Sequence, residues 1–322
     1  MPAYNEEEKI GETIKRIKKS FEADFYSKEG AVITEKLIQV VDDGSTDKTA
    51  EIAKQSGADF VVSYKPNRRL AYAFKRAVEN SLEQGADIMV NIDADGQFNP
   101  NDIPHLLSPI LSGQCDMTIA NRFGRHEAKD IPFIKDFLNR LAAKIIGFFL
   151  NYPIEDLTCG FRAHNRETLL RFNLTNVHFT YTQETIIDAI GKNLKLKWIP
   201  VEVSYFADRK SRIVRFIGKY VSDSAKIILK AIRDVRPMKF FGVPGLFLII
   251  ISFILFGVFF FLYIQEFKIT PYRNYLFLGI PLFLVGLQFL VFALIADMIK
   301  TNRNLTEEQM YLMKKEKYKK NS

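Results

Sequence analysis

The chain has 322 residues and a formal net charge of +8, with 48% hydrophobic and 25% charged residues. This balance excludes a disordered chain and allows one large domain with an appendage, or two domains. The sequence has two cysteines without C-x-x-C spacing and four scattered histidines, so it predicts neither a disulfide framework nor a zinc site.

Helical and strand patterns alternate through the first two thirds of the chain. The first helix, 5–21, shows a stripe of Ile10, Ile14, Ile17 and Phe21. The segments that follow are, in chain order, strand 37–41, helix 48–55, strand 60–63, helix 70–82, strand 88–92, helix 103–111 and strand 117–120. Such alternation predicts an α/β fold, with helices on both faces of a mostly parallel sheet.

Pairs of carboxylates follow two of these strands. Asp42 and Asp43 follow strand 37–41, and Asp93 and Asp95 follow strand 88–92. Ligands of such sheets bind at the carboxyl ends of strands. The oxygens of Asp93 and Asp95 suit Mg²⁺ or Mn²⁺, which takes few carboxylates together with substrate phosphates. The pair therefore indicates a metal that stabilises a diphosphate leaving group, although acidic strand ends also serve as turn caps.

A basic amphipathic stretch, residues 213–232, comes next. Its apolar residues follow three- and four-residue spacing, and Arg215, Lys219, Lys226 and Lys230 lie between them. Such a helix lies in a membrane interface or packs on the soluble domain, and the sequence leaves both readings open.

Two uncharged runs, 241–264 and 275–296, come near the end of the chain. Each is longer than the ~20 residues that cross ~30 Å of hydrocarbon as a helix. They are apolar on every face, so we expect transmembrane helices rather than a pair of buried core helices.

Charge around these runs predicts their orientation. Their flanks are rich in Lys and Arg, whereas the connecting loop, 265–274, has one Glu, one Lys and one Arg. The positive-inside rule therefore places both flanks in the cytosol, with a multi-pass hairpin in the cytoplasmic membrane. We expect a cytosolic domain at 1–212, a juxtamembrane helix at 213–240, the hairpin at 241–299 and a basic cytosolic tail at 300–322.

Several short motifs occur together between residues 2 and 212. They are PAYNE at 2–6, DDGSTD at 42–47, DADGQ at 93–97, ANRF at 120–123 and DLTCGFR at 156–162. In order and approximate spacing they resemble the family 2 glycosyltransferases with the GT-A (Rossmann-like) fold. With the hairpin, the chain is similar to polyprenyl-phosphate glycosyltransferases, the group that includes dolichyl-phosphate mannose synthase.

The resemblance implies donor-binding residues near the N-terminus. Pro2, Tyr4 and Glu6 match the segment that holds the nucleoside. Either Asp42 or Asp43 matches the acid that contacts the base or the ribose.

It also implies where the phosphates bind. Asp93, Asp95 and Gln97 match the positions at the metal and the donor diphosphate, and Arg122 matches an arginine near the phosphates. Structural salt-bridge formation is the alternative role for Arg122.

The acceptor site is implied by three further matches. Lys135 falls where these enzymes often carry an arginine for the acceptor phosphate, and Arg209 and Ser211 match an Arg…Ser-Lys segment near the phosphates. Lys135 on a solvated helix face, and Arg209 in a solvated basic loop, are the alternatives.

The expected mechanism follows from the charge of a polyprenyl monophosphate acceptor. Its second pKa is near 6, so it arrives as a nucleophilic dianion that needs countercharge rather than a base. The candidate catalytic residues are Asp95, Arg122, Lys135, Asp156 and Arg209, and the expected displacement at the anomeric carbon inverts it. Asp156 is expected to orient groups, although a sugar-hydroxyl acceptor would make it a general base.

Two departures from the family pattern stand out. Relatives carry an apolar strand before the first motif, whereas here Met1 directly precedes it, so we expect this strand to be missing and the natural start to lie upstream. Relatives read Asn-x-Gly-x-Gly-x-Ala where this chain has Arg69 and Ala71 after Asn67, so backbone approach to the nucleotide should differ.

Other functions were weighed against this one. A processive polysaccharide synthase would carry Gln-x-x-Arg-Trp, but the single Trp198 lacks that context. A non-catalytic membrane adaptor fits the lost glycines but not the intact acidic motifs, and another lipid or glycan acceptor is a further alternative. The sequence predicts a nucleotide-sugar donor, a membrane and no nucleic acid as partners, and leaves homo-oligomerisation open.

Overall fold

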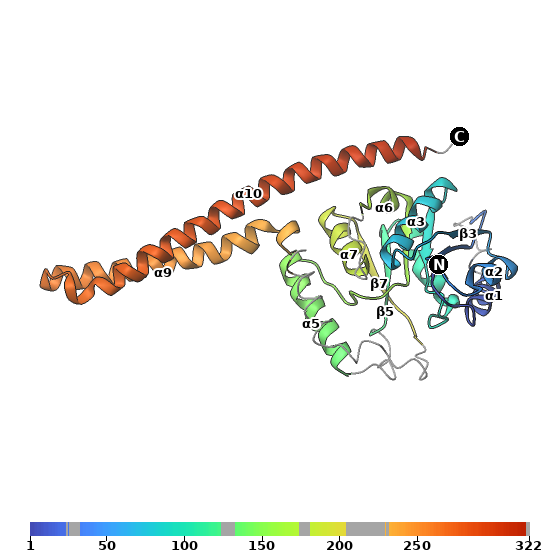
Figure 1. The fold of residues 1–322 in the computed structure, drawn as a ribbon, viewed down its shortest axis with the longest axis horizontal. Helices are drawn as coiled ribbons and strands as arrows, with labels where there is room; N and C mark the ends of the chain where they lie inside the picture. Colours follow the sequence, from blue (N-terminus) through green and yellow to red (C-terminus); the bar gives the residue numbers. More distant parts are fainter. Residues whose placement is uncertain are drawn as a thin grey trace. The chain divides into compact units, whose positions relative to one another are not determined.

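The computed structural model of the protein describes residues 1–23, 25, 33–123, 133–173, 181–203, 229 and 232–319, with backbone alone at 133–138. By its contacts the chain divides into two compact units. The first comprises Met1–Phe148, Tyr152–Ser224 and Glu308–Ser322, and the second comprises Phe149–Asn151 and Ala225–Glu307 (Figure 1).

The first unit contains a three-stranded parallel sheet in the order β1 (Pro2–Ala3), β2 (Gln39–Asp42), β3 (Phe60–Ser63). Helices α1 (Ile10–Ser20), α2 (Thr49–Gln55) and α3 (Leu70–Glu83) connect and cover it. The predicted stripe of Ile10, Ile14 and Ile17 is buried, because residues three and four apart share one face of a helix.

The expectation that the first strand is missing needs correction. Pro2 and Ala3 pair with Val41 and Asp42, and the Met1 carbonyl accepts a hydrogen bond from Val41 N at 2.9 Å. Pro2 and Ala3, inside the first motif, therefore form a short strand themselves, since their backbone groups pair with the edge of β2.

A second sheet has the order β4 (Ile88–Asn91), β6 (Arg162–Asn165), β5 (Met117–Asn121), β7 (Leu196–Pro200). Strand β6 runs antiparallel to both β4 and β5, whereas β5 and β7 are parallel. The predicted α/β class is confirmed, but as two sheets, one of them mixed. The sequence of β6 gave no strand signal, because its alternate residues are the polar but fully buried Arg162 and His164.

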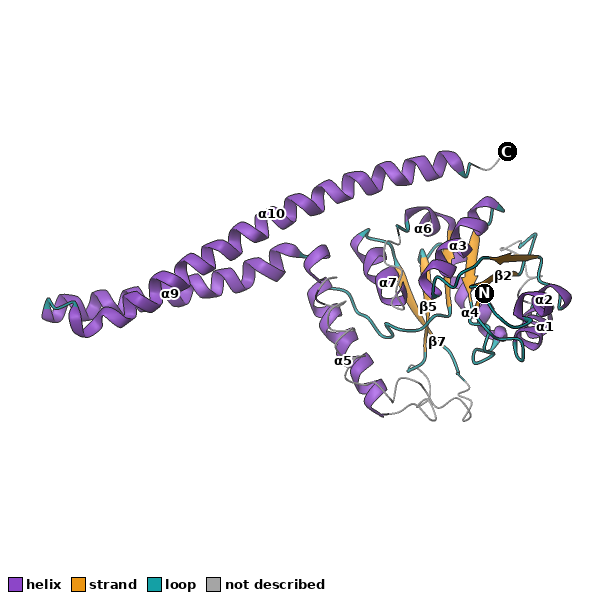
Figure 2. Ribbon diagram, in the orientation of Figure 1, coloured by secondary structure: helices purple, strands orange, loops and turns teal. Residues whose placement is uncertain are grey.

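Further helices belong to this unit. They are the 3₁₀ turn η2 (Pro100–Asp102), α4 (Ile103–Leu111), α5 (Phe133–Leu150, which ends in the second unit), α6 (Arg166–Arg171) and α7 (Tyr181–Gly191). Figure 2 shows α4, α6 and α7 near the strands. Asn165 caps α6 by accepting a hydrogen bond from Thr168 N at 2.8 Å.

Strand register brings three loops to one edge of the second sheet. Asn91, at the carboxyl end of β4, pairs with Arg162, at the amino end of β6. Ile119, near the carboxyl end of β5, pairs with the same Arg162. The segments 92–97, 122–123 and 156–161 therefore leave the sheet side by side, and all three carry predicted site residues.

The second unit contains two long apolar helices, α9 (Val243–Glu266) and the greater part of α10 (Arg273–Lys317). They are preceded by the short helical segments η4 (Met238–Gly242) and η5 (Thr270–Tyr272), respectively. Both are long and apolar enough to cross a membrane, and only 17% of the most apolar window of each is buried. Within this unit, Ser252 Oγ donates to Gly279 O at 2.8 Å, and a Cβ on Gly245 would lie 2.9 Å from Gly286 O. Small residues thus let the two backbones approach, as in membrane helix pairs, and the helices associate the chain with a membrane.

The segment after the second apolar run is helical. Helix α10 continues to Lys317, and from Glu308 on the chain belongs to the first unit. There Tyr311 Oη donates to Glu167 Oε2 at 3.0 Å, and Lys314 Nζ donates to Phe172 O at 2.6 Å. The amphipathic stretch 213–232, apart from residues 229 and 232, lies outside the described residues.

His164 is buried in the core of the first unit, between Phe74 and Phe172. Burial, and then the charge of Arg162, lower its pKa to about 3. The unfolded chain, with a histidine pKa near 6.5, binds a proton that the folded chain excludes. The contribution of His164 to the free energy of unfolding is therefore fully present above pH ~6.5, and it is lost progressively as the pH falls from 6.5 toward 3.

We expect this histidine to cost about 2 kcal/mol of unfolding free energy between pH 7 and pH 5, at about 1.36 kcal/mol per pH unit below 6.5. His164→Leu should remove that part of the pH dependence. Denaturant unfolding followed by the fluorescence of Trp198 at both pH values measures the effect. Equal pH dependence in the variant and the wild type would contradict it.

Candidate active site

The Asp93–Gln97 segment forms a tight turn after β4. Asp95 Oδ1 accepts a hydrogen bond from Gln97 N at 3.1 Å, and Gly96 has a left-handed φ of +74°. The turn thus keeps Asp93, Asp95 and Gln97 within one short segment just after the strand.

Helix α1 holds this turn from outside. Thr13 Oγ1 donates to Ala94 O at 3.2 Å, and Arg16 Nη1 donates to Gly96 O at 3.2 Å. Sequence reasoning missed both residues, because a polar position on an amphipathic helix gives no sign of its distant partner.

Asp93 and Asp95 repel one another electrostatically. Burial, and then the charge of Asp95, raise the pKa of Asp93 to about 6, while the charges of Arg122 and Arg162 act in the opposite direction. Within the described part of the chain, no cluster of three His, Cys, Asp or Glu side chains is placed to hold a metal. Two carboxylates beside Gln97 fit a hard cation whose other ligands are water and diphosphate oxygens.

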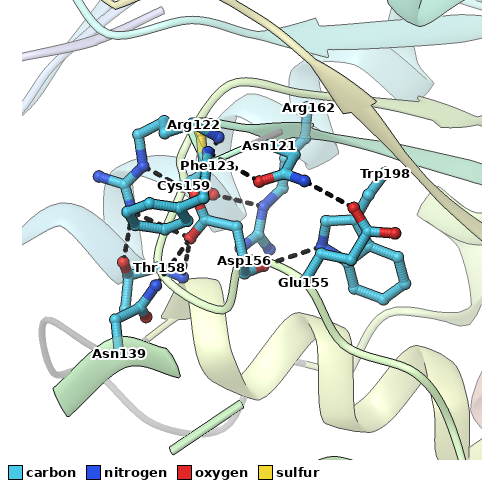
Figure 3. A network of polar contacts seen from close by, with 10 residues as sticks. All are labelled: Asn121, Arg122, Phe123, Asn139, Glu155, Asp156, Thr158, Cys159, Arg162 and Trp198. Atoms are coloured by element: carbon cyan, nitrogen blue, oxygen red, sulfur yellow. Dashed lines mark hydrogen bonds and ion pairs between the residues drawn. The ribbon is translucent and has the colours of Figure 1, made fainter. Parts of the chain in front are cut away.

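Arg122 and Asp156 form a buried ion pair (Figure 3). Arg122 Nε donates to Asp156 Oδ2 at 2.8 Å and Nη2 donates to Oδ1 at 2.9 Å, so the pair is bidentate. Burial alone would raise the pKa of Asp156, but the charge and hydrogen bonds of Arg122 lower it overall. Asp156 is therefore an ionised, fully buried group whose charge orients Arg122.

Other side chains fix this pair in place (Figure 3). Thr158 Oγ1 accepts from Arg122 Nη2 at 2.6 Å, Asn139 Nδ2 reaches Asp156 Oδ1 at 3.4 Å, and Trp198 Nε1 donates to Asp156 O at 3.0 Å. Thr158 belongs to a motif already singled out. Asn139 and Trp198 come from α5 and β7, and nothing in their local sequence pointed to this role.

The first motif, residues 2–6, and the segment after β2 are held together. Asn5 N donates to Ser45 Oγ at 3.0 Å, and Glu6 N donates to Thr49 Oγ1 at 2.8 Å. Pro2 is buried in β1, whereas Tyr4 is 46% exposed.

Asp42 and Asp43 are both buried, and each carboxylate accepts a hydrogen bond from a backbone N–H. Asp42 Oδ1 accepts from Ser45 N at 3.0 Å, and Asp43 Oδ1 accepts from Arg68 N at 2.8 Å. The structure thus assigns Asp42 to its own turn and Asp43 to the loop before α3. Which of the two contacts a nucleoside stays a prediction.

Arg69 keeps a backbone conformation typical of glycine. Its φ of 75° and ψ of 162° lie in a region that non-glycine residues avoid, and it immediately precedes α3. Ala71 is buried within α3. The backbone at position 69 therefore keeps the shape that a glycine would give, with an added exposed side chain.

The proposed acceptor residues are less completely described. Lys135 lies in α5, where only the backbone is described, and Arg209 and Ser211 lie outside the described residues. Their roles stay predictions.

Comparison with known proteins shows the family of the chain. A match to "Glycosyl transferase family 2" spans residues 1–171, which include β1 and all the motifs named above. An uncharacterized protein of Methanocaldococcus jannaschii, MJ1222, is 34% identical over 72% of this chain and 89% of its own length. A UDP-N-acetylglucosamine–dolichyl-phosphate N-acetylglucosaminyltransferase of Methanococcus voltae is 27% identical over 64% of this chain and 84% of its own length.

A solved structure shares the fold. Glucosyl-3-phosphoglycerate synthase from Mycobacterium tuberculosis superimposes with a TM-score of 0.53 at 20% identity, over 72% of this chain and 76% of that one. The expected GT-A fold and the family resemblance are thus confirmed: the chain belongs to glycosyl transferase family 2.

Proposed function

We propose that this protein transfers a sugar from a nucleotide-sugar donor to a polyprenyl monophosphate, with inversion at the anomeric carbon. The observation that carries the proposal is the presence, on one chain, of a family 2 glycosyltransferase unit and two helices long enough to cross a membrane. A lipid acceptor explains why the catalytic unit is carried on a membrane anchor. The printed name of the Methanococcus voltae relative gives a dolichyl phosphate as its acceptor, which supports the same class here.

A divalent cation, Mg²⁺ or Mn²⁺, completes the proposed donor site. Asp93 and Asp95 would hold it, with Gln97 beside them, and when bound it would offset the charge that develops on the leaving diphosphate. The Mycobacterium tuberculosis structure contains Mn²⁺ and UDP, which supports a metal in this fold. Tyr4, Glu6 and one of the two buried aspartates after β2 would contact the nucleoside.

The ion pair suits an acceptor that needs no base. Asp156 is held ionised by Arg122, so it is expected to orient this arginine rather than to remove a proton. Arg122 would then present a fixed guanidinium to the phosphates. Lys135, Arg209 and Ser211 would guide the acceptor phosphate.

Removing charge at the acceptor site should weaken acceptor binding selectively. Lys135→Gln and Arg209→Gln should each raise the KM for undecaprenyl phosphate about 10-fold or more, because each change removes a charge-assisted contact to phosphate. The KM for the nucleotide sugar should change little. Steady-state kinetics with both substrates varied measures this, with Lys144→Gln, an exposed lysine on the same helix, as control. Equal losses for both substrates would refute the acceptor assignment.

We further propose that the catalytic unit is cytosolic and that only the loop between the two spans faces outward. Cys115 and Cys159 are buried, so a single introduced cysteine can report exposure. A membrane-impermeant thiol reagent added from outside should modify Lys268→Cys and spare Lys19→Cys in α1. The reverse labelling pattern would refute this topology.

A further inference from the structure

The turn at Cys159 and Gly160, just before β6, lies directly against Asp93. A Cβ built on Gly160 would stand 3.2 Å from each carboxylate oxygen of Asp93 and 3.3 Å from Tyr181 Oη. Gly160 has no left-handed φ, so its backbone would accept another residue. The glycine is explained by the space that Asp93 takes, because any larger side chain must displace that carboxylate by a few tenths of an ångström.

Hydrogen bonds hold this turn so that it cannot yield easily. Asn91 Nδ2 donates to Gly160 O at 2.8 Å, and Arg162 Nε donates to Cys159 O at 2.7 Å (Figure 3 shows the second). Arg162 Nη1 also donates to Thr185 Oγ1 of α7 at 2.6 Å. Asn91 and Arg162 are at most 1% exposed, so the turn is bonded on two sides by side chains that are themselves packed in the core.

Tyr181 also lies against Gly160. It is the first residue of α7, it is 1% exposed, and its ring lies 4.7 Å from that of Phe74. Its hydroxyl accepts from Asn91 Nδ2 at 3.3 Å. This hydroxyl and the Asp93 carboxylate border the same point, because a Cβ on Gly160 would lie within 3.3 Å of both.

We propose that Gly160 and Tyr181 are positioning residues for Asp93, which together fix the direction in which its carboxylate meets a divalent cation and diphosphate. The inference rests on the proposed metal site and adds residues from two other elements to it. Groups that orient a metal ligand typically change metal affinity 10- to 100-fold when altered.

Binding of Mn²⁺ tests this without reference to turnover. The full chain in detergent is titrated with Mn²⁺ in the presence of UDP, and in parallel GDP, and free Mn²⁺ is followed by electron paramagnetic resonance. We expect Gly160→Ala to weaken Mn²⁺ binding about 10-fold and Gly160→Val to weaken it further. Tyr181→Phe, which keeps the ring packing, should weaken it several-fold.

Tyr152→Phe is the matched control. Like Tyr181→Phe, it removes one tyrosine hydroxyl. The Tyr152 hydroxyl is hydrogen-bonded to Leu196 N and O rather than placed near Asp93, so Mn²⁺ affinity should not change. If both Gly160→Ala and Tyr181→Phe bind Mn²⁺ with wild-type affinity, the positioning role is wrong, whereas the proposed metal site still stands. Absence of Mn²⁺ binding by the wild-type chain would refute the metal site and the inference with it. If Gly160→Ala does not fold, as judged by circular dichroism, the comparison of Tyr181→Phe with Tyr152→Phe decides.

Discussion

Asp95→Asn should lower kcat at least about 100-fold, a loss of about 2.7 kcal/mol of transition-state stabilisation. Asparagine keeps the oxygen that accepts from Gln97 N, so the turn after β4 should survive. What disappears is the second negative charge of the Asp93–Asp95 pair, which the proposed cation needs. Initial rates of sugar transfer at saturating substrates, with Mg²⁺ and with Mn²⁺, measure the effect.

Asp87→Asn provides the matched control for this prediction. Asp87 is an exposed carboxylate at the opposite end of the same strand, immediately before β4. Its replacement should leave kcat nearly unchanged. Near-normal turnover of Asp95→Asn, or full wild-type activity in EDTA, would show that the pair does not act through a metal.

Asp156→Ala should lower the free energy of unfolding by about 3–5 kcal/mol, because it leaves the Arg122 guanidinium buried without its counterion. Asp156 is fully buried and the side chain of Arg122 is only 11% exposed, so water cannot replace the lost partner. Denaturant unfolding of the full chain, followed by Trp198 fluorescence and circular dichroism, measures the change.

A surface ion pair offers the comparison. Glu79→Ala breaks a contact with Arg76 in which both side chains are about a third exposed, and it should cost less than ~1 kcal/mol. The double variant Arg122→Met/Asp156→Leu should recover much of the stability lost in Asp156→Ala, since no unpaired charge remains. A cost of under ~1 kcal/mol for Asp156→Ala would show that the pair is not buried as described.

Periodic patterns explain which parts of the fold could be predicted. Strand 60–63 and helix 103–111 were predicted with the observed bounds. The strand is a short aromatic and β-branched run, and the buried residues of the helix follow three- and four-residue spacing. The first helix begins at Ile10 rather than at Asn5, whose positive φ belongs to the loop that bonds to Ser45. Strand β6 was missed because tertiary contacts, not its own pattern, bury Arg162 and His164.

Residues of the candidate site that lie in short sequence motifs could be predicted, whereas residues that join the site through tertiary packing could not. The carboxylates of Asp93 and Asp95 were found from their place after a strand. The bidentate pairing of Arg122 with Asp156 joins residues 34 apart in the chain, and Asn139 and Trp198 join from still other elements. Such contacts depend on the register of β4, β5 and β6, which single-sequence patterns do not specify.

Transfer to lipid tests the central claim most directly. The purified full chain in lipid nanodiscs is incubated with Mg²⁺ or Mn²⁺, a panel of labelled UDP- and GDP-sugars, and either polyprenyl phosphate or the same polyprenol without phosphate. We predict that label from one donor enters the organic-phase lipid only when the phosphate is present. Equal labelling of the unphosphorylated polyprenol, or no lipid labelling from any donor, would contradict the account.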